Sequence, residues 1–314
     1  MTAKGPPVTR PRTKRLLRPG VLEERKCLQE LVLLPALLLA GLALTGCGGA
    51  SGGAVSLPKV APARTYSLQN FQPAAPVRPG RPTTVSFTIR QPSGRPLTAY
   101  RRCCDPHAGV DLIIVRSDDS HVQYDDSDIG PGGRVSQPIV FPASGRYRVI
   151  VDAYPAHTAT GQPINFQLFT QIKVTGAYRP QPVPPYRALQ TVDGYRFQVE
   201  GHPRLKAIQA AFLTIKVTDP SGRPARFGTW RGALAHAIFI RKGTLDYFHT
   251  HVCSPGALYC TSVLGATRVT GSSSRPGLLR VGVLLPAPGT WRMFLLTYLG
   301  GRHVTTPITL NAGA

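Results

Sequence analysis

The chain has 314 residues, and its 37 lysines and arginines outnumber its 15 aspartates and glutamates, so its formal net charge at pH 7 is +22. The basic residues are scattered along the chain and no nucleic-acid-binding motif accompanies them, which argues against nucleic acid as a partner. The sequence also lacks a phosphate-binding loop of the Gly-Lys-Ser/Thr type, which argues against a nucleotide-hydrolysing enzyme.

The first residues predict an export signal that ends in a lipid anchor. A basic leader precedes an apolar run from Leu31 to Leu44, which is shorter than the roughly 20 residues that a membrane-spanning helix needs. The sequence Leu44-Thr45-Gly46-Cys47 resembles the lipobox of bacterial lipoproteins. This resemblance implies that residues 1–46 are a signal peptide, that Cys47 carries acyl chains such as palmitate, and that the mature chain is lipid-anchored at the extracytoplasmic face of the cell membrane.

Composition then divides the rest of the chain. Residues 47–64 are rich in Gly and Ala and are predicted to form a flexible tether. Residues 179–185 hold four prolines in seven positions, so 177–190 is predicted to be a Pro-rich, semi-rigid linker. We therefore expect a first domain at 65–176 and a second at 191–314.

An internal repeat relates these two domains. Three blocks recur in the same order: Pro92-Ser93-Gly94-Arg95-Pro96 as Pro220-Ser221-Gly222-Arg223-Pro224, 111–116 as 236–241, and 141–148 as 285–292. Each block includes or follows a short run rich in Val, Ile, Thr and aromatic residues, and Pro and Gly punctuate the runs. The sequence predicts an all-β fold, with two tandem immunoglobulin-like β-sandwich domains after the signal peptide and tether.

The cysteines agree with an oxidising, extracellular location. Cys253 and Cys260 flank Ser254-Pro255-Gly256 and are predicted to form a local disulfide. The partners of Cys103 and Cys104 stay open, because two adjacent cysteines make only a strained bond with each other.

Histidines in the second repeat form the only pattern that indicates chemistry. If Lys242-Gly243 is a two-residue hairpin turn, His236 lies directly opposite His249. His251 then shares the same face, because side chains two apart on a strand point the same way. Three imidazoles in one patch predict a site for copper or zinc.

Two further residues are candidate ligands, and two alternatives stay open. Cys253 continues on the same face unless it is in a disulfide, and His303 joins the patch only if the last strand runs beside the hairpin. A three-residue turn would slip the register by one and move His236 to the other face. Alternatively, the histidines are a solvent-exposed or loosely packed group at the end of a hairpin and bind no metal.

The first repeat carries Asp111, Tyr124 and Asp126 at the equivalent positions, a set that does not suit a soft metal. Its acidic stretch, Asp118-Asp119 and Asp125-Asp126-Ser127-Asp128, lacks the spacing of an EF-hand loop. We expect these acids to be solvated at a hairpin tip.

A strand, a Gly-containing turn, His-x-His and a Pro-x-x-Gly-x-Tyr/Trp-Arg strand together resemble the YtkA-like family of extracytoplasmic β-sandwich domains. The resemblance covers 210–300 and, more loosely, 85–155. It implies a copper-associated accessory domain with ligands at His236, His249 and His251, although Val252 replaces the family's proline. The Glu that a cupin enzyme needs after His-x-His is absent, so the leading hypothesis is a non-enzymatic metal-binding lipoprotein. The competing hypothesis is a structural or protein-binding cell-surface lipoprotein with incidental histidines and an unknown protein partner.

Overall fold

The computed structural model describes residues 65–101, 109–156, 165–244, 246–255, 257 and 269–314. Within these ranges the only helical element is the 3-10 turn η1 (Pro131–Gly133), and no helix there is long and apolar enough to cross a membrane. The predicted signal peptide, the lipidation site Cys47 and the tether fall outside the described residues. So do Cys103, Cys104 and Cys260.

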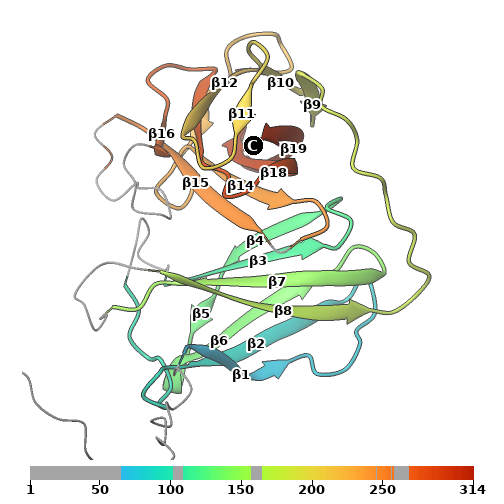
Figure 1. The fold of residues 1–314 in the computed structure, drawn as a ribbon, viewed down its shortest axis with the longest axis vertical. Coiled ribbons are helices and arrows are strands. Elements are labelled where there is room, and N and C mark those ends of the chain that lie inside the picture. Colours follow the sequence, from blue (N-terminus) through green and yellow to red (C-terminus); the bar gives the residue numbers. More distant parts are fainter. Residues whose placement is uncertain (1–64, 102–108, 157–164, 245, 256, 258–268) are drawn as a thin grey trace, which may run out of the picture. The chain divides into compact units, whose positions relative to one another are not determined.

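The first repeat forms two four-stranded antiparallel sheets (Figure 1). One sheet has the order β1 (Ser67–Gln72), β2 (Pro82–Arg90), β6 (Arg134–Val140) and β5 (Asp128–Ile129). The other has the order β4 (Val122–Asp126), β3 (Val110–Arg116), β7 (Gly145–Ala153) and β8 (Phe166–Val174). A common core lies between them, because alternate residues such as Phe87 of β2 and Val149 of β7 are buried in one cluster.

This strand order defines the class of fold. The sheets β1-β2-β6-β5 and β4-β3-β7-β8 have the order of the ABED and C′CFG sheets of an immunoglobulin sandwich. The prediction of an all-β fold with immunoglobulin-like sandwiches is therefore confirmed.

The second repeat forms one continuous sheet of eleven strands. Its order is β11 (Leu205–Lys206), β19 (Arg302–Gly313), β18 (Gly289–Leu299), β14 (Ala235–Arg241), β15 (Tyr247–Cys253), β16 (Gly271–Ser272), β17 (Leu278–Val283), β12 (Ala211–Thr218), β10 (Tyr195–Val199) and β9 (Leu189–Val192), with β13 (Phe227–Gly228) paired to β18. Phe197 of β10 and Phe239 of β14 lie in one core cluster, so the two halves of the sheet pack against each other as two layers. The short strand β16 joins these layers by pairing with both β15 and β17.

The two repeats share the same topology. The order β1-β2-β6 recurs as β10-β12-β17, and β4-β3-β7-β8 recurs as β15-β14-β18-β19. The three sequence blocks occupy equivalent places, since β7 and β18 both begin at the glycine of the third block. The internal repeat read from the sequence is thus a repeat of structure.

An aromatic corner holds the third block in both repeats. The hydroxyl of Tyr147 donates a hydrogen bond to the carbonyl oxygen of Ala143 at 2.9 Å. In the second repeat the indole Nε1 of Trp291 donates to the carbonyl oxygen of Ala287 at 3.0 Å. Both rings are fully buried, so each corner combines apolar packing with a satisfied polar group.

The first block is a tight turn that requires glycine. Gly94 and Gly222 have φ angles of 87° and 81°, a conformation that side chains disfavour. Their amides donate to the carbonyl oxygens of Gln91 and Asp219, at 2.8 and 2.9 Å. The glycine of this block therefore recurs because the turn requires a residue with a positive φ angle.

Part of the acidic stretch is buried, contrary to the prediction of a solvated hairpin tip. Asp119 is only 2% exposed and forms an ion pair with Arg148. Asp118 accepts a bond from Arg116 at 2.7 Å and a second from the Ser120 hydroxyl. The pKa of Asp119 is raised to about 6, because burial outweighs the opposing charge of Arg148. The sequence did not show that arginines on neighbouring strands reach these carboxylates.

A third apolar cluster joins the two repeats, which belong to one compact unit of the chain. It contains Ile113 and Tyr124 from the first repeat and Ile238 and Phe294 from the second. These residues lie on β3 and β4 of the first repeat and on β14 and β18 of the second, in the sheets that correspond to each other in the two repeats. The cluster covers the face of the hairpin that carries the histidines.

Candidate metal centre

The β14–β15 hairpin has a longer turn than the sequence predicted. Arg241 donates its amide to the carbonyl oxygen of Asp246 at 3.1 Å, and Thr244 donates to Arg241 at 3.2 Å, so four residues form the loop. The Arg241 guanidinium also binds the Asp246 carboxylate at 2.9 Å. The predicted pairing of His236 with His249 is therefore wrong, and His236 pairs with His251.

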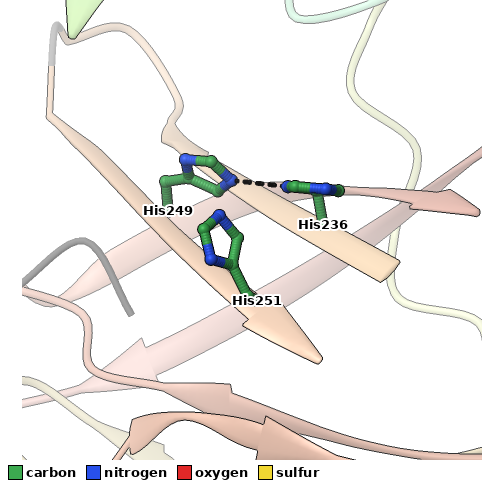
Figure 2. A group of neighbouring side chains, drawn as sticks. All are labelled: His236, His249 and His251. Atoms are coloured by element: carbon green, nitrogen blue, oxygen red, sulfur yellow. Dashed lines mark hydrogen bonds between the residues drawn. The ribbon is translucent and has the colours of Figure 1, made fainter. Parts of the chain in front are cut away.

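The register differs from the predicted one by two residues, and an even shift leaves every side chain on its face. His236, His249 and His251 consequently still share one face of the hairpin, as Figure 2 shows. The alternative of a one-residue slip is wrong.

The three imidazoles form a tight, buried group. Their exposed fractions are 1% for His236, 0% for His249 and 4% for His251, so the alternative of a solvent-exposed group is wrong. One ring nitrogen of each lies within 4.8 Å of the other two. The closest pair is Nδ1 of His236 and Nε2 of His249, at 3.3 Å (Figure 2).

A backbone carbonyl orients the first ring. Nε2 of His236 lies 3.0 Å from the carbonyl oxygen of Trp230, which can only accept a hydrogen bond. Nε2 therefore carries the proton, and the lone pair of Nδ1 faces the cluster. Metal-binding histidines are commonly held in this way, with the second ring nitrogen bound to a carbonyl or carboxylate.

Burial keeps the rings neutral. The pKa of His236 is lowered well below 6.5, first by burial and then by the charge that His251 would carry. The pKa of His249 is lowered for the same reasons, with smaller contributions from His236 and Arg231. Neutral imidazole is the form that binds a metal ion, so the group is competent at neutral pH.

The distance between the closest nitrogens fits a shared metal ion. Two nitrogens bound tetrahedrally at about 2.0–2.1 Å lie about 3.3–3.4 Å apart. The 3.3 Å separation of His236 Nδ1 and His249 Nε2 matches this value. The donor set of imidazole nitrogens suits copper and zinc.

The structure places the other two candidate ligands outside this group. Cys253 lies at the end of β15, and its ligand atom is not among the three that cluster. His303 lies on β19, which β18 separates from the hairpin, so the condition under which His303 would join the patch is not met. The His303 ring packs against Trp230 in a tilted arrangement, with centroids 4.6 Å apart. Because Cys260 lies outside the described residues, its pairing with Cys253 stays a prediction.

Residues of the first repeat complete the surroundings. The Tyr124 ring lies 5.3 Å from the rings of both His236 and His249. Asp111 and Asp152 form a second group with His249, again with ligand atoms within 4.8 Å of one another.

Sequence reasoning recognised Asp111 and Tyr124 as equivalents of the histidines but missed Asp152 and Trp230. A lone acid in the apolar run Val149–Ala153 was the available signal for Asp152.

Among protein-family models, one matches part of the chain, and it describes a domain of unknown function. Residues 190–314 match a family model described as "Domain of unknown function (DUF8832)", which covers less than half of the chain. No curated protein matches the sequence.

Solved structures give distant likenesses over about four fifths of the chain. The Escherichia coli adhesin FdeC is 12% identical with a TM-score of 0.26, and the chain covers 65% of it. The bacterial integrin-binding protein invasin is 15% identical with a TM-score of 0.23, and domains 4 and 5 of the S-layer protein SbsC are 13% identical with a TM-score of 0.22. The chain spans 39% of the invasin structure and 97% of the SbsC structure. These likenesses are too distant to indicate a function, which is inferred from the geometry of the histidine group.

Acidification should destabilise the metal-free protein through His236 and His249. The pKa values of these two side chains in the folded state lie below 6.5, so the unfolded chain binds more protons, and stability is lost as the pH falls below that value. Each such group contributes up to about 1.4 kcal/mol per pH unit.

The measurement is the free energy of unfolding in urea, with chelator present, between about pH 7.5 and about pH 5. His249→Gln should lose stability less steeply than the parent, and His202→Gln at an exposed position is the matched control. A slope for His249→Gln equal to that of the parent would contradict the buried, neutral state of this ring.

Proposed function

We propose that the protein is a non-enzymatic, lipid-anchored extracytoplasmic lipoprotein that binds a transition metal ion through His236, His249 and His251. The observation that carries the proposal is the 3.3 Å separation of two neutral, buried ring nitrogens with a third imidazole beside them. Copper is the preferred ion, because a site of given nitrogen ligands binds Cu²⁺ more tightly than other divalent first-row ions, and zinc is the next candidate.

The location follows from the sequence. The lipobox at Leu44 to Cys47 supports acylation, and the resemblance to YtkA-like domains supports a role in holding or delivering metal outside the cell. Both repeats would then stand beyond the membrane on the 47–64 tether.

A structural role for the histidines is the second candidate. The ring of Tyr124 packs against His236 and His249, and Trp230 packs against His236 at 5.0 Å. Histidines can serve as packing residues in an aromatic interface between the two repeats. In that case the chain would be a structural or protein-binding surface lipoprotein, and its histidines would bind no metal.

Metal binding separates the two candidates. Purified protein dialysed against Cu²⁺ or Zn²⁺ should retain about one ion per chain, as expected of one shared site. The double variant His249→Ala/His251→Ala should lose that ion, whereas His202→Ala should keep it.

Circular dichroism of each variant verifies the fold. If the parent binds no stoichiometric metal, or if the double variant binds as much as the parent, the structural role is the correct one.

Acylation is tested by replacing Cys47. In a bacterial host the parent should take up radiolabelled palmitate and sediment with membranes, since two acyl chains give stable anchoring. Cys47→Ala should do neither, and Cys27→Ala, which alters only the predicted signal peptide, should behave as the parent does. Label on the Cys47→Ala protein would overturn the proposed anchor.

A further inference from the structure

Two carboxylates lie buried beside the histidine group, on the strands of the first repeat. Asp111 of β3 and Asp152 of β7 are directly paired across the sheet. Asp111 is 5% exposed and Asp152 is not exposed at all. A ring nitrogen of His249 lies within 4.8 Å of a carboxylate oxygen of each.

Such a pair is costly to bury without compensation. Two like charges in a low-dielectric interior repel each other, and each loses its hydration. A bound cation would remove the repulsion, as it does in carboxylate metal sites.

Neighbouring groups hold one carboxylate as a metal ligand is held. The amide Nδ2 of Asn165 donates to Oδ1 of Asp152 at 2.6 Å, and the hydroxyl of Tyr247 lies 3.4 Å from Oδ2. Hydrogen bonds of this kind fix the orientation of metal-bound carboxylates.

His249 provides an independent indication of a ligand. Its Nε2 faces His236, but its Nδ1 is buried and has no hydrogen-bond partner among the described residues. A buried ring nitrogen without a partner is rare in folded proteins, because it gives up its hydrogen bond to water. The side chain is completely buried, so a bound ion is the direct way to satisfy this atom.

A cavity borders one residue of the group. It has a volume of about 330 Å³ and is lined by His249, Tyr247 and Gln167 together with apolar side chains, whereas neither Asp111 nor Asp152 is among its lining residues. Three protein ligands leave coordination positions that water can fill, as in catalytic zinc sites.

We propose that Asp111, Asp152 and His249 form a second site for a divalent cation, with harder ligands than the histidine group. Two carboxylates and one imidazole suit Mn²⁺. The site is built by both repeats, since two of its ligands come from the first and one from the second.

The second site does not require that the histidine group binds a metal ion. Only the sharing of His249 between two ions rests on the proposed function. One ring nitrogen binds one ion, so both sites are filled together only when His249 bridges them, with Nε2 on one ion and Nδ1 on the other. The ring then gives up its single N–H proton to solvent as both nitrogen–metal bonds form. No oxidant or reductant takes part.

Mn²⁺ titration of the chelator-treated protein, followed by electron paramagnetic resonance, tests the second site. The parent should bind about one Mn²⁺ per chain. Asp111→Asn/Asp152→Asn, which keeps side-chain size, should weaken binding at least about tenfold. Asp128→Asn at an exposed position is the matched control and should bind as the parent does.

Two further measurements keep the two proposals apart. His236→Ala/His251→Ala should bind copper more weakly than the parent but bind Mn²⁺ as the parent does, whereas the Asp double variant should bind Mn²⁺ more weakly but keep the parent's affinity for copper. Mn²⁺ on the parent should also show nitrogen coupling from one directly bound imidazole. Absence of that coupling, or equal Mn²⁺ binding by the parent and the Asp double variant, would overturn the second site whatever happens to copper.

Discussion

The site depends on the burial of both faces of the β14–β15 hairpin. Its inner face packs into the core of the second sandwich through residues such as Phe239 and Phe248. Its outer face would meet water in an isolated sandwich, but here Ile113 and Tyr124 of the first repeat cover it. Every residue described in β14 from Ala235 to Ile240 is consequently buried.

This burial decides the chemistry of the histidines. In water each imidazole would titrate near its usual pKa and move among rotamers. Between the repeats burial favours the neutral form of His236 and His249, and the carbonyl of Trp230 fixes His236 in one tautomer. The same contact brings Asp111 and Asp152 of the first repeat to His249 of the second. The two repeats together hold a combination of carboxylates and imidazoles that neither repeat holds alone.

Much of the fold could be predicted from the sequence, but little of what surrounds the histidines could. Alternating runs such as Val85 to Ile89 and the repeated Pro-Ser-Gly-Arg-Pro turns predicted strands and their duplication correctly, because local periodicity and turn chemistry determine both. The shared face of the three histidines was also predictable, although their pairing was not. The hairpin closes at Arg241 and Asp246 and not at Arg241 and Thr244, as Lys242-Gly243 suggested, and only the even size of the resulting shift preserved the face.

Burial could not be predicted, since it depends on residues of the first repeat that lie far from the hairpin in sequence. Nothing local to His249 indicates Tyr124, Asp111 or Asp152 as its neighbours. The role of Asp119 was missed for the same reason, because its partner Arg148 lies on another strand.

X-ray absorption of the copper- or zinc-loaded protein decides whether the three histidines hold the metal, since it reports the atoms bound to the ion. Three imidazole nitrogens are expected at about 2.0 Å, with the outer-shell scattering that imidazole rings produce. Binding through oxygen or sulfur alone, without imidazole scattering, would contradict this expectation.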